Sequence, residues 1–487
     1  MSGRTRRQFL EDSMFAAAAA VAAGSETPVA GCEENVSRSS LERLGVAVVG
    51  VRGRGGSHIS AWAGRKDTEV LYVCDADREM GRRRVVEAGK RQRGRVPRFQ
   101  EDLRRVLEDP RVDVVSIATP NHWLALAAIW AMQAGKDVYV EKPVSHNVTE
   151  GRRIVEAARR YGRVCQAGLQ CRSNRGAIDA MRYVHQGCIG QVRVARSLCY
   201  KRRTDVGSAG HYPLPPEVNY DLWLGPAEMA PLTRPRFHHY WHWQWPYGNG
   251  ELGHQAIHQL DMARWSLGPG ARTRGVISYG GRFGAPDAGE TADTQVVVHD
   301  CGDAAVVCEV RGLSSEAYRG AKVGVVVEGS EGYLVMTSYT SGSAFDRDGN
   351  AVQHFRGGGG DPFANFLRAV RTRRVGALNA DIEEGHLSST LCHLGNISYR
   401  LGEPLPLAQL QRRLDDRSTS DDAQQTLQRT VCHLQSNRLD IANLPFHVGP
   451  WLAFDPCTEA FVDAPKADEL LTRRYRPPFE IPAAGRV

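Results

Sequence analysis

Hydrophobic residues in the first third of the chain form short continuous runs, separated by stretches with helical periodicity. Five runs have the length of strands: 44–50, 69–75, 113–120, 137–143 and 163–170. Such runs are typical of strands buried on both faces of a parallel sheet. Helices are predicted between them, among them 122–135, which ends at a glycine, and 147–161. This alternation predicts a doubly wound α/β sheet over residues 44–172.

The pattern changes from residue 173, where a second domain is predicted to extend to 402. A helix to about 186 leads into 191–201, whose alternation predicts a half-exposed strand. Further strands are predicted at 294–300, 304–310, 322–329 and 332–338, and helices at 361–374 and 381–401. Closely spaced strands followed by helices predict an α+β domain with an open, largely antiparallel sheet and helices on one face. Residues 403–487 form an extension with no predicted role.

The N-terminus carries the features of an export signal over residues 1–32. The segment "TRRQFL" (5–10) precedes a weakly apolar run at 13–24, which indicates a twin-arginine signal and a periplasmic protein. The run is too short for a stable membrane span. The alternative to an export signal is a disordered basic start. The segment "VAGC" (29–32) also fits a lipoprotein cleavage box, with a lipid anchor at Cys32. Residues 33–43 are predicted to be a linker.

Composition narrows the class of protein. The chain has 487 residues, 42% hydrophobic and 24% charged, as in soluble globular proteins, and a net charge of +7. Its many arginines are scattered rather than interleaved with aromatic residues, which argues against a nucleic-acid partner. The 11 cysteines form no CxxC pair, so neither a zinc ribbon nor a disulfide scaffold is indicated.

The first candidate site is the glycine-rich turn "GVRGRGG" (50–56), between a strand and a helix. Gly50 and Gly55 fit the dinucleotide fingerprint, but Arg52 replaces the middle glycine and Gly53 is displaced by one. Asp75 ends the second strand about 20 residues further on, where a carboxylate accepts from a ribose hydroxyl. A carboxylate there repels a 2′-phosphate, so NAD is favoured over NADP; a simple helix cap is the alternative for Asp75.

Lys142 in "VYVEKP" follows the strand at 137–143, at the carboxyl edge where doubly wound sheets bind ligands. Beside a positively charged nicotinamide, its ammonium form would be disfavoured, and the lysine could act as an acid or base near neutral pH. An exposed surface lysine is the alternative.

The segment "GELGHQAIHQLD" (250–261) places His254, His258 and Asp261 on one face if it is helical, and they would converge on a small volume. Three interpretations remain open: proton transfer or substrate binding, satisfied structural histidines, and a metal site. For a metal site, three upstream histidines are candidate further ligands: His238, His239 and His242. The H-E-x-x-H glutamate is missing. Histidine suits proton transfer because its reference pKa is about 6.5.

Three motifs together resemble the glucose-fructose oxidoreductase, inositol dehydrogenase and MocA (Gfo/Idh/MocA) family: "TPNH" (119–122), "AGKDVYVEKP" (134–143) and "GELGHQAIHQLDMARWSLG" (250–268). The resemblance extends over roughly residues 44–402, and "DIEEGHLSSTLCHLGNISYRLG" (381–402) resembles the exported, twin-arginine subgroup of this family. The resemblance implies an N-terminal Rossmann domain and a C-terminal domain whose open sheet often forms the subunit contact, hence a homo-oligomer. It also implies hydride transfer between NAD(P) and a sugar or cyclitol hydroxyl, without a metal.

Residue roles follow from the same resemblance. Lys142 corresponds to the lysine that contacts nicotinamide and substrate, and His258 to the histidine that exchanges the hydroxyl proton. His254 stands where the dehydrogenases commonly have aspartate. Asp261 matches the aspartate of the H-x-x-D pattern and is expected to be mainly structural, or to be a partner of a residue that contacts the substrate. The expected cofactor-binding residues are Gly50, Arg52, Gly53, Gly55, Asp75, Thr119, Asn121, His122, Glu141, Lys142 and Gln170. The expected substrate-binding residues are His254, Arg172 and Trp243.

The sequence therefore predicts an NAD-dependent oxidoreductase acting on a carbohydrate or cyclitol with a tightly bound cofactor. Two alternatives stay open: a redox-initiated epimerase, lyase or glycosidase that recycles its NAD, and a non-catalytic nucleotide-binding sensor or scaffold. The aromatic stretch at 238–247 fits either core packing or stacking on a sugar ring.

Overall fold

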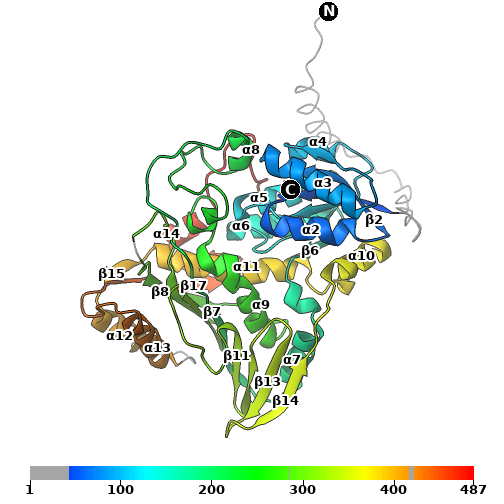
Figure 1. Cartoon of the computed structure of the whole chain (residues 1–487). Helices are drawn as coiled ribbons and strands as arrows, with labels where there is room; N and C mark the ends of the chain where they lie inside the picture. Colours follow the sequence, from blue (N-terminus) through cyan, green and yellow to red (C-terminus); the bar gives the residue numbers. More distant parts are fainter. Residues whose placement is uncertain (1–42, 285, 416–421) are drawn as a thin grey trace, which may run out of the picture. The chain divides into compact units, whose positions relative to one another are not determined.

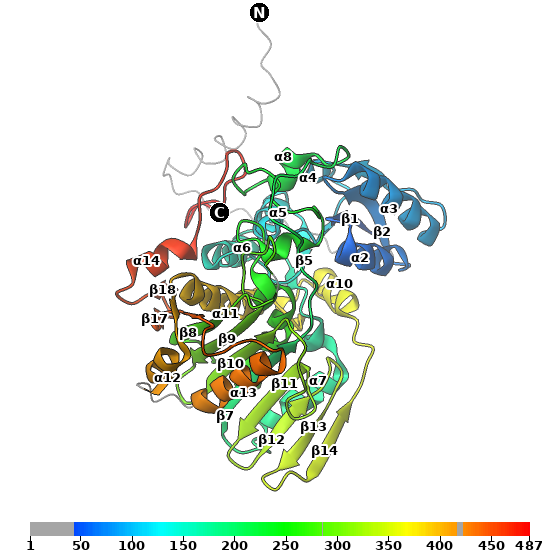
Figure 2. The same ribbon diagram turned by 60° about the vertical axis from the view of Figure 1, so that its left-hand side comes forward.

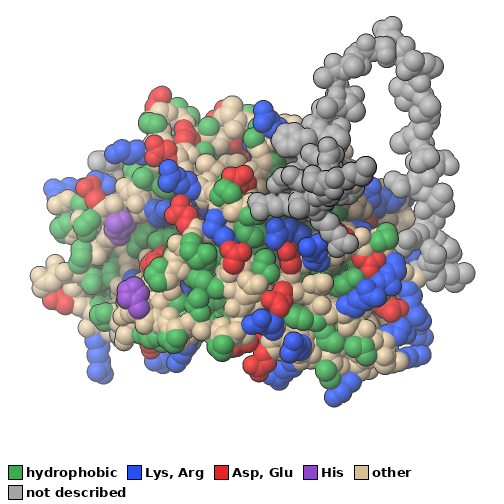
Figure 3. All heavy atoms as spheres, turned by 90° about the horizontal axis from the view of Figure 1, so that it is seen from above, with side chains coloured by type: hydrophobic (Ala, Val, Ile, Leu, Met, Phe, Trp, Pro, Cys, Tyr) green, Lys and Arg blue, Asp and Glu red, His purple; other side chains and the backbone are tan. Residues whose placement is uncertain are grey.

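The computed structural model describes residues 43–284, 286–415 and 422–487 (Figure 1). The predicted export signal with Cys32, and all but the last residue of the predicted linker, lie outside the described residues. Within the described part, no helix has the length and apolar character needed to cross a membrane. Viewed from above, Lys and Arg side chains lie among Asp, Glu and apolar side chains over much of the visible face (Figure 3).

The first domain is built on six parallel strands. They are β1 (Leu44–Val49), β2 (Thr68–Cys74), β3 (Arg98–Gln100), β4 (Val114–Ile117), β5 (Asp137–Val140) and β6 (Cys165–Ala167). Their order is β3-β2-β1-β4-β5-β6, and every neighbouring pair is parallel. The doubly wound sheet predicted from the apolar runs is confirmed. Because the strand order reverses between β1 and β4, ligands are expected at the carboxyl ends of these strands.

Helices cover both faces of this sheet. They are α2 (Gly53–Ala63), α3 (Arg78–Arg91), α4 (Leu103–Leu107), α5 (Asn121–Gln133) and α6 (Val148–Arg160). A later helix, α10 (Pro362–Thr372), also packs on this domain, where Phe363 stacks on Tyr139 with ring centroids 4.7 Å apart. Asp361 caps α10 and Pro362 occupies its first turn. The chain thus returns to the first domain after residue 172.

The second domain contains a twelve-stranded sheet. Its main strands are β7 (Val192–Tyr200), β8 (Gly275–Gly281), β9 (Thr294–Asp300), β10 (Ala305–Arg311), β11 (Val323–Gly329), β12 (Gly332–Met336), β13 (Ser341–Asp346) and β14 (Ala351–Arg356). Only β7 and β10 pair in parallel; the other pairs are antiparallel, as predicted. One face packs on α7 (Arg175–His185), α9 (Ile257–Ser266) and α11 (Ile382–Arg400).

The extension after residue 402 changes the expected picture of this sheet. Helices α12 (Leu407–Asp415) and α13 (Ala423–Ser436) pack on its other face, against Val194, Val296 and Val298 (Figure 2). Two expectations are therefore wrong: the sheet has helices on both faces, and β7 is almost entirely buried rather than half exposed. Both faces of β7 are buried, and Arg196 lies on the face that α13 covers. There Arg196 pairs with Asp422, the residue before α13.

The rest of the extension adds strands and then crosses back to the first domain. Strands β16 (Phe446–Val448) and β17 (Leu452–Asp455) pair with β8, and β15 (Glu403–Leu405) pairs with β16. The tail 472–487 then packs on the first domain, where Arg473 donates to the carbonyl of His122 at 3.2 Å. Phe479 packs edge-on against Trp123 of α5, with ring centroids 5.5 Å apart.

Truncating Phe479 tests whether this tail stabilises the fold. Phe479 is 2% exposed, so Phe479→Ala leaves a cavity beside α5. We expect a loss of about 3–5 kcal/mol in the free energy of unfolding, measured by urea denaturation. Glu480→Ala, at the exposed neighbouring position, is the matched control and should change stability little. Equal stability of both variants would show that the tail is not part of the folded core.

Candidate active site

A cavity of about 770 Å³ lies at the carboxyl edge of the first sheet and extends to the second domain. The first domain contributes the β1–α2 turn and the ends of β2, β4 and β5. The second contributes the loop 201–250, the start of the helix at 252–266 and Tyr339. Of the residues predicted to bind cofactor or substrate or to act in catalysis, those lining it are Gly50, Arg52, Gly53, Asp75, Thr119, Asn121, Glu141, Lys142, Gln170, His254 and His258.

The glycine turn has the geometry of a phosphate cradle. Gly50 has φ +75°, and a Cβ there would lie 2.6 Å from the Thr119 amide nitrogen. A Cβ on Gly55 would lie 1.8 Å from the carbonyl oxygen of Gly50, so both positions require glycine. Gly53 begins α2, and a Cβ there would meet open space. The α2 N-terminus, whose first amides have no intrahelical acceptor, thus borders open space, as a bound diphosphate requires.

Asp75 lies at the end of β2 beside this turn. Its carboxylate accepts from the amide of Val51 at 2.7 Å and of Asp77 at 2.9 Å, which fixes its orientation. Burial raises the pKa of Asp75. The Arg52 guanidinium, at the cavity wall, pairs with Asp77 at 3.0 Å.

Glu141 organises the centre of the cavity. Its Oε1 accepts from Arg54 Nε at 2.8 Å and Gln170 Nε2 at 2.9 Å, and lies 3.1 Å from His58 Nε2. Burial alone would raise the pKa of Glu141, but His58 and Arg54 hold it well below its usual range. Glu141 is therefore an ionised anchor that holds Arg54 and Gln170 at the cavity wall.

Lys142 connects the two domains at the cavity. Its Nζ donates to the backbone carbonyl of His254 at 2.6 Å. His254 lies in a π-helical turn, Leu252–Ala256, that precedes α9. Such turns interrupt the regular α-helical hydrogen bonds and are frequent at functional sites. Burial lowers the pKa of Lys142.

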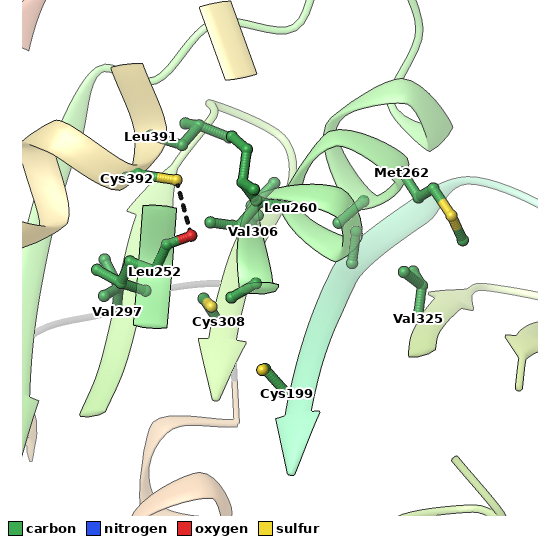
Figure 4. Close-up of a cluster of buried hydrophobic side chains, with 14 of the residues drawn as sticks. Cys199, Leu252, Leu260, Met262, Val297, Val306, Cys308, Val325, Leu391 and Cys392 are labelled. Atoms are coloured by element: carbon green, nitrogen blue, oxygen red, sulfur yellow. Dashed lines mark hydrogen bonds between the residues drawn. The ribbon is translucent and has the colours of Figure 1, made fainter. Parts of the chain in front are cut away.

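The π turn is held from the opposite side by α11. The Cys392 thiol donates to the Leu252 carbonyl at 3.3 Å, within a cluster of buried side chains that includes Leu260 and Leu391 (Figure 4). The position of His254, and of the carbonyl that binds Lys142, is thus set by packing of the second domain.

The two histidines predicted to share one face both line the cavity. Burial, with the nearby Lys142 ammonium, lowers the pKa of His258 to about 3. His258 Nδ1 is buried and has no hydrogen-bond partner among the described residues, so Nε2 is the nitrogen that remains for a ligand. The His254 ring stacks on His242 with centroids 4.0 Å apart, and burial lowers its pKa well below the usual range.

Asp261 does not join them. Its carboxylate lies away from the cavity, where it accepts from Arg172 Nη2 at 2.8 Å and from the Ser388 hydroxyl at 2.7 Å. The expectation that all three side chains converge is wrong: His258 and Asp261 share the regular helix α9, but the Asp261 carboxylate pairs with Arg172, and only the two histidines line the cavity. Its interpretation as a structural residue fits this buried ion pair.

Four predicted site residues lie outside the cavity lining: Gly55, which packs on the Gly50 carbonyl, and the three side chains of Arg172, Trp243 and His122. Arg172 is committed to Asp261 and Glu384 and is buried, so its predicted substrate contact is not supported by its position. Trp243 is buried in a separate cluster with Val206. His122 is buried, with Nε2 2.9 Å from the Trp223 carbonyl oxygen, so it contacts the loop instead of lining the cavity.

Other cavity residues were missed by sequence reasoning. Trp241 belongs to the aromatic stretch, whose density of rings is the signal that could have found it, and His239 of the same stretch was expected only as a candidate metal ligand. Gln255 lies within the histidine motif. Tyr339 lies in a turn between β12 and β13 and has no local sequence signal.

The cluster of His239, His242 and His254 does not assemble a metal site: no group of three or more metal-ligating side chains suited to an ion occurs in the described residues.

Comparison with protein families identifies the two domains. Residues 44–169 match the model "Oxidoreductase family, NAD-binding Rossmann fold" of the Gfo/Idh/MocA family. Residues 204–431 match its "C-terminal alpha/beta domain". The chain belongs to the Gfo/Idh/MocA family of oxidoreductases. Its first domain is an NAD-binding Rossmann domain, and the cradle, Asp75 and the open space at Gly53 suit that cofactor.

Individual relatives match over shorter segments. Levoglucosan dehydrogenase of Pseudarthrobacter phenanthrenivorans is 28% identical over 36% of this chain and 38% of its own length. An alpha-N-acetylgalactosaminidase of Shewanella oneidensis is 29% identical over 31% of this chain and 34% of its own. The chain thus matches little more than a third of either relative.

A solved structure shares the fold over most of the chain. The WlbA dehydrogenase from Bordetella pertussis, in complex with NADH and UDP-GlcNAcA, is 19% identical, with a TM-score of 0.53. The match covers 73% of this chain and 97% of that one.

Two glycine substitutions separate folding from cofactor binding. Gly53→Ala adds a methyl group in the open cradle, where it meets no protein atom, so thermal stability should be unchanged. The NAD affinity measured by calorimetry should be roughly tenfold weaker, which corresponds to about 1.4 kcal/mol of binding free energy. Gly50→Ala, at positive φ and in contact with Thr119, should lower both NAD affinity and melting temperature. Normal NAD affinity in Gly53→Ala would place the diphosphate elsewhere.

Asp261→Asn tests the structural assignment of this carboxylate. Removing its charge leaves Arg172 buried beside a weaker partner, so we expect a loss of about 3–5 kcal/mol in the free energy of unfolding. The fraction that folds should keep its NAD affinity, measured by calorimetry. Asp303→Asn, at an exposed position, is the control. A variant with full stability but no activity would instead make Asp261 catalytic.

Proposed function

We propose that this protein is an NAD-dependent oxidoreductase that transfers hydride between a carbohydrate or cyclitol CH–OH group and a tightly bound nicotinamide cofactor. The observation that carries this is the single cavity shared by the glycine cradle, Lys142 and His258. Membership of an oxidoreductase family and relatives named for sugars support it. When bound, NAD supplies the hydride acceptor.

Lys142 would bind the reacting hydroxyl. One of its three N–H bonds is directed to the His254 carbonyl, which leaves the others for the substrate oxygen. Its lowered pKa makes this ammonium a better hydrogen-bond donor and a readier proton source than a surface lysine. It therefore stabilises the negative charge that develops on the oxygen as the hydroxyl proton leaves.

His258 would exchange the hydroxyl proton at Nε2. Since its pKa in the free protein is about 3, the imidazole is neutral near pH 7 and can accept a proton. Hydride departure makes the hydroxyl more acidic, so proton transfer to His258 and hydride loss assist each other. Since no described residue bonds to Nδ1, packing against the Tyr339 ring, with centroids 5.2 Å apart, positions the imidazole.

The carboxylates at the other end of the cavity would select NAD over NADP. Asp75, Glu101 and Asp102 all line this end. A ribose with two hydroxyls can donate to Asp75, whereas an added 2′-phosphate would be repelled. The α2 amides would hold the diphosphate.

A second candidate is a redox-neutral reaction in which oxidation is transient and the same cofactor is reduced and then reoxidised. The relative named alpha-N-acetylgalactosaminidase favours it, since a glycosidase yields no net redox change. The two candidates differ in whether NADH accumulates as product forms.

Export through a twin-arginine signal is also part of the proposal, on the strength of "TRRQFL" at 5–10. This route carries folded proteins, so NAD could be bound before the membrane is crossed. Cleavage of a signal at the end of the predicted segment would be detected by N-terminal sequencing of the exported protein.

Substitution of His258 tests the proposed chemistry. With a panel of aldoses, amino sugars, sugar acids and cyclitols, His258→Ala should lower kcat by about 10²–10⁴ because proton transfer is lost. NAD affinity should be unchanged. Lys142→Met should lower kcat similarly, and His211→Ala, an exposed histidine, is the matched control. Unchanged turnover in both site variants would remove these residues from the reaction; no turnover of any compound by the native protein would favour a sensor or scaffold.

A further inference from the structure

The charged side chains around the cavity are distributed unevenly. The acidic lining residues are Asp75, Glu101 and Asp102 at the dinucleotide end and Glu141 at the centre. Glu141 is paired with Arg54. The second-domain end is lined by Lys142, His239, Trp241, His254, Gln255, His258 and Tyr339. Among the described residues, no aspartate or glutamate lines this second-domain end, which is where the substrate would bind.

The side chains behind this lining do not restore a negative charge. Glu251 lies nearby, but it is 2% exposed and its carboxylate is paired with Arg203 at 3.0 Å. Lys201 is exposed, and its Nζ donates to Gln255 Oε1 at 3.4 Å. The substrate end therefore carries the charges of Lys142 and Lys201 without an unpaired carboxylate.

Hydrogen-bonding groups at this end remain available. The His254 imidazole stacks on His242 and lies edge-on to His239 at 6.0 Å. Neither His254 nor His239 uses a ring nitrogen in a hydrogen bond within the described part of the chain. A ligand entering here would meet two imidazoles, an amide and an ammonium group. Carboxylate oxygens only accept hydrogen bonds and accept them more strongly than the hydroxyls of a neutral polyol, which both donate and accept.

We infer that the substrate is a sugar acid, whose carboxylate binds between His254 and His239 with Lys201 at the entrance. This inference rests on the proposed function and specifies its substrate. The two neutral imidazoles can each donate one N–H to a carboxylate, and Lys201 at the entrance supplies a positive charge that matches a single negative charge. A phosphate ester fits less well, because the nearby Arg203 is already bound to Glu251 and phosphate sites favour free guanidinium groups.

The electrostatics of the histidines agree with this assignment. In the free protein, burial, His242 and Lys142 lower the pKa of His254, and burial and Lys142 lower that of His258. A bound carboxylate opposes the charge of Lys142 and so raises both pKa values. His258 then becomes a stronger base only when the correct substrate is present.

Calorimetry on the NADH-loaded protein tests the inference without requiring turnover. The probes are matched pairs: D-glucuronate with D-glucose and D-galacturonate with D-galactose, together with glucose 6-phosphate. At least one sugar acid should bind at least tenfold more tightly than its neutral partner and than the phosphate ester. Equal or tighter binding of the neutral sugars, or preference for the phosphate ester, would overturn it.

Single substitutions test which residues cause the preference for sugar acids over neutral sugars. His254→Asp should reduce the acid-over-neutral ratio at least tenfold, while His354→Asp on the exposed strand β14 should leave it unchanged. Lys201→Glu, at an exposed position that should not disturb folding, should weaken acid binding severalfold, with Lys466→Glu as control. An unchanged ratio in both site variants would contradict the assignment. Tight binding of a sugar acid to the NAD-loaded protein without NADH formation or product would instead refute the proposed reaction and leave the charge preference intact.

Discussion

The hydrogen bond from Lys142 Nζ to the His254 carbonyl joins the two halves of the site. Lys142 follows β5 of the Rossmann domain, and His254 lies in the π turn of the second domain. Buried ammonium groups need acceptors, and this carbonyl supplies one while leaving the other N–H bonds directed at the cavity. The relative positions of cofactor cradle, lysine and histidines therefore depend on this contact, and through Cys392 and Leu252 on the packing of α11.

The C-terminal extension reinforces that arrangement from outside. Helices α12 and α13 cover the face of the large sheet around β7 to β10, and the tail 472–487 packs on α5, whose first turn lines the cavity. One chain segment thus contacts both domains. This covering also limits the predicted homo-oligomer, because a subunit contact through this sheet would have to use strands that α12 and α13 leave uncovered. The oligomer stays a prediction.

Local patterns predicted the Rossmann sheet well, because strands buried on both faces give continuous apolar runs and glycine turns have specific backbone demands. Gly50, Gly55 and Lys142 could be placed from such patterns. The same reasoning failed where a position depends on distant segments. β7 looked half exposed because its second face is covered by residues more than 200 positions away. Asp261 lies away from the cavity because it pairs with Arg172, which comes from a distant segment of the chain. Tyr339 reaches the cavity through tertiary folding alone. Trp241 and Trp243 are the same residue type in the same stretch, yet Trp241 lines the cavity and Trp243 is buried in a separate cluster.

Isotope transfer tests most directly the claim that hydride moves between a sugar carbon and the bound nicotinamide. The NAD-loaded protein would be mixed with perdeuterated sugars or sugar acids for a single turnover, denatured, and the released nucleotide analysed by mass spectrometry. The account predicts NADH carrying one deuterium in the native protein and unlabelled NAD in His258→Ala. Product formation with a nucleotide that never acquires deuterium, even in rapidly quenched samples, would contradict it.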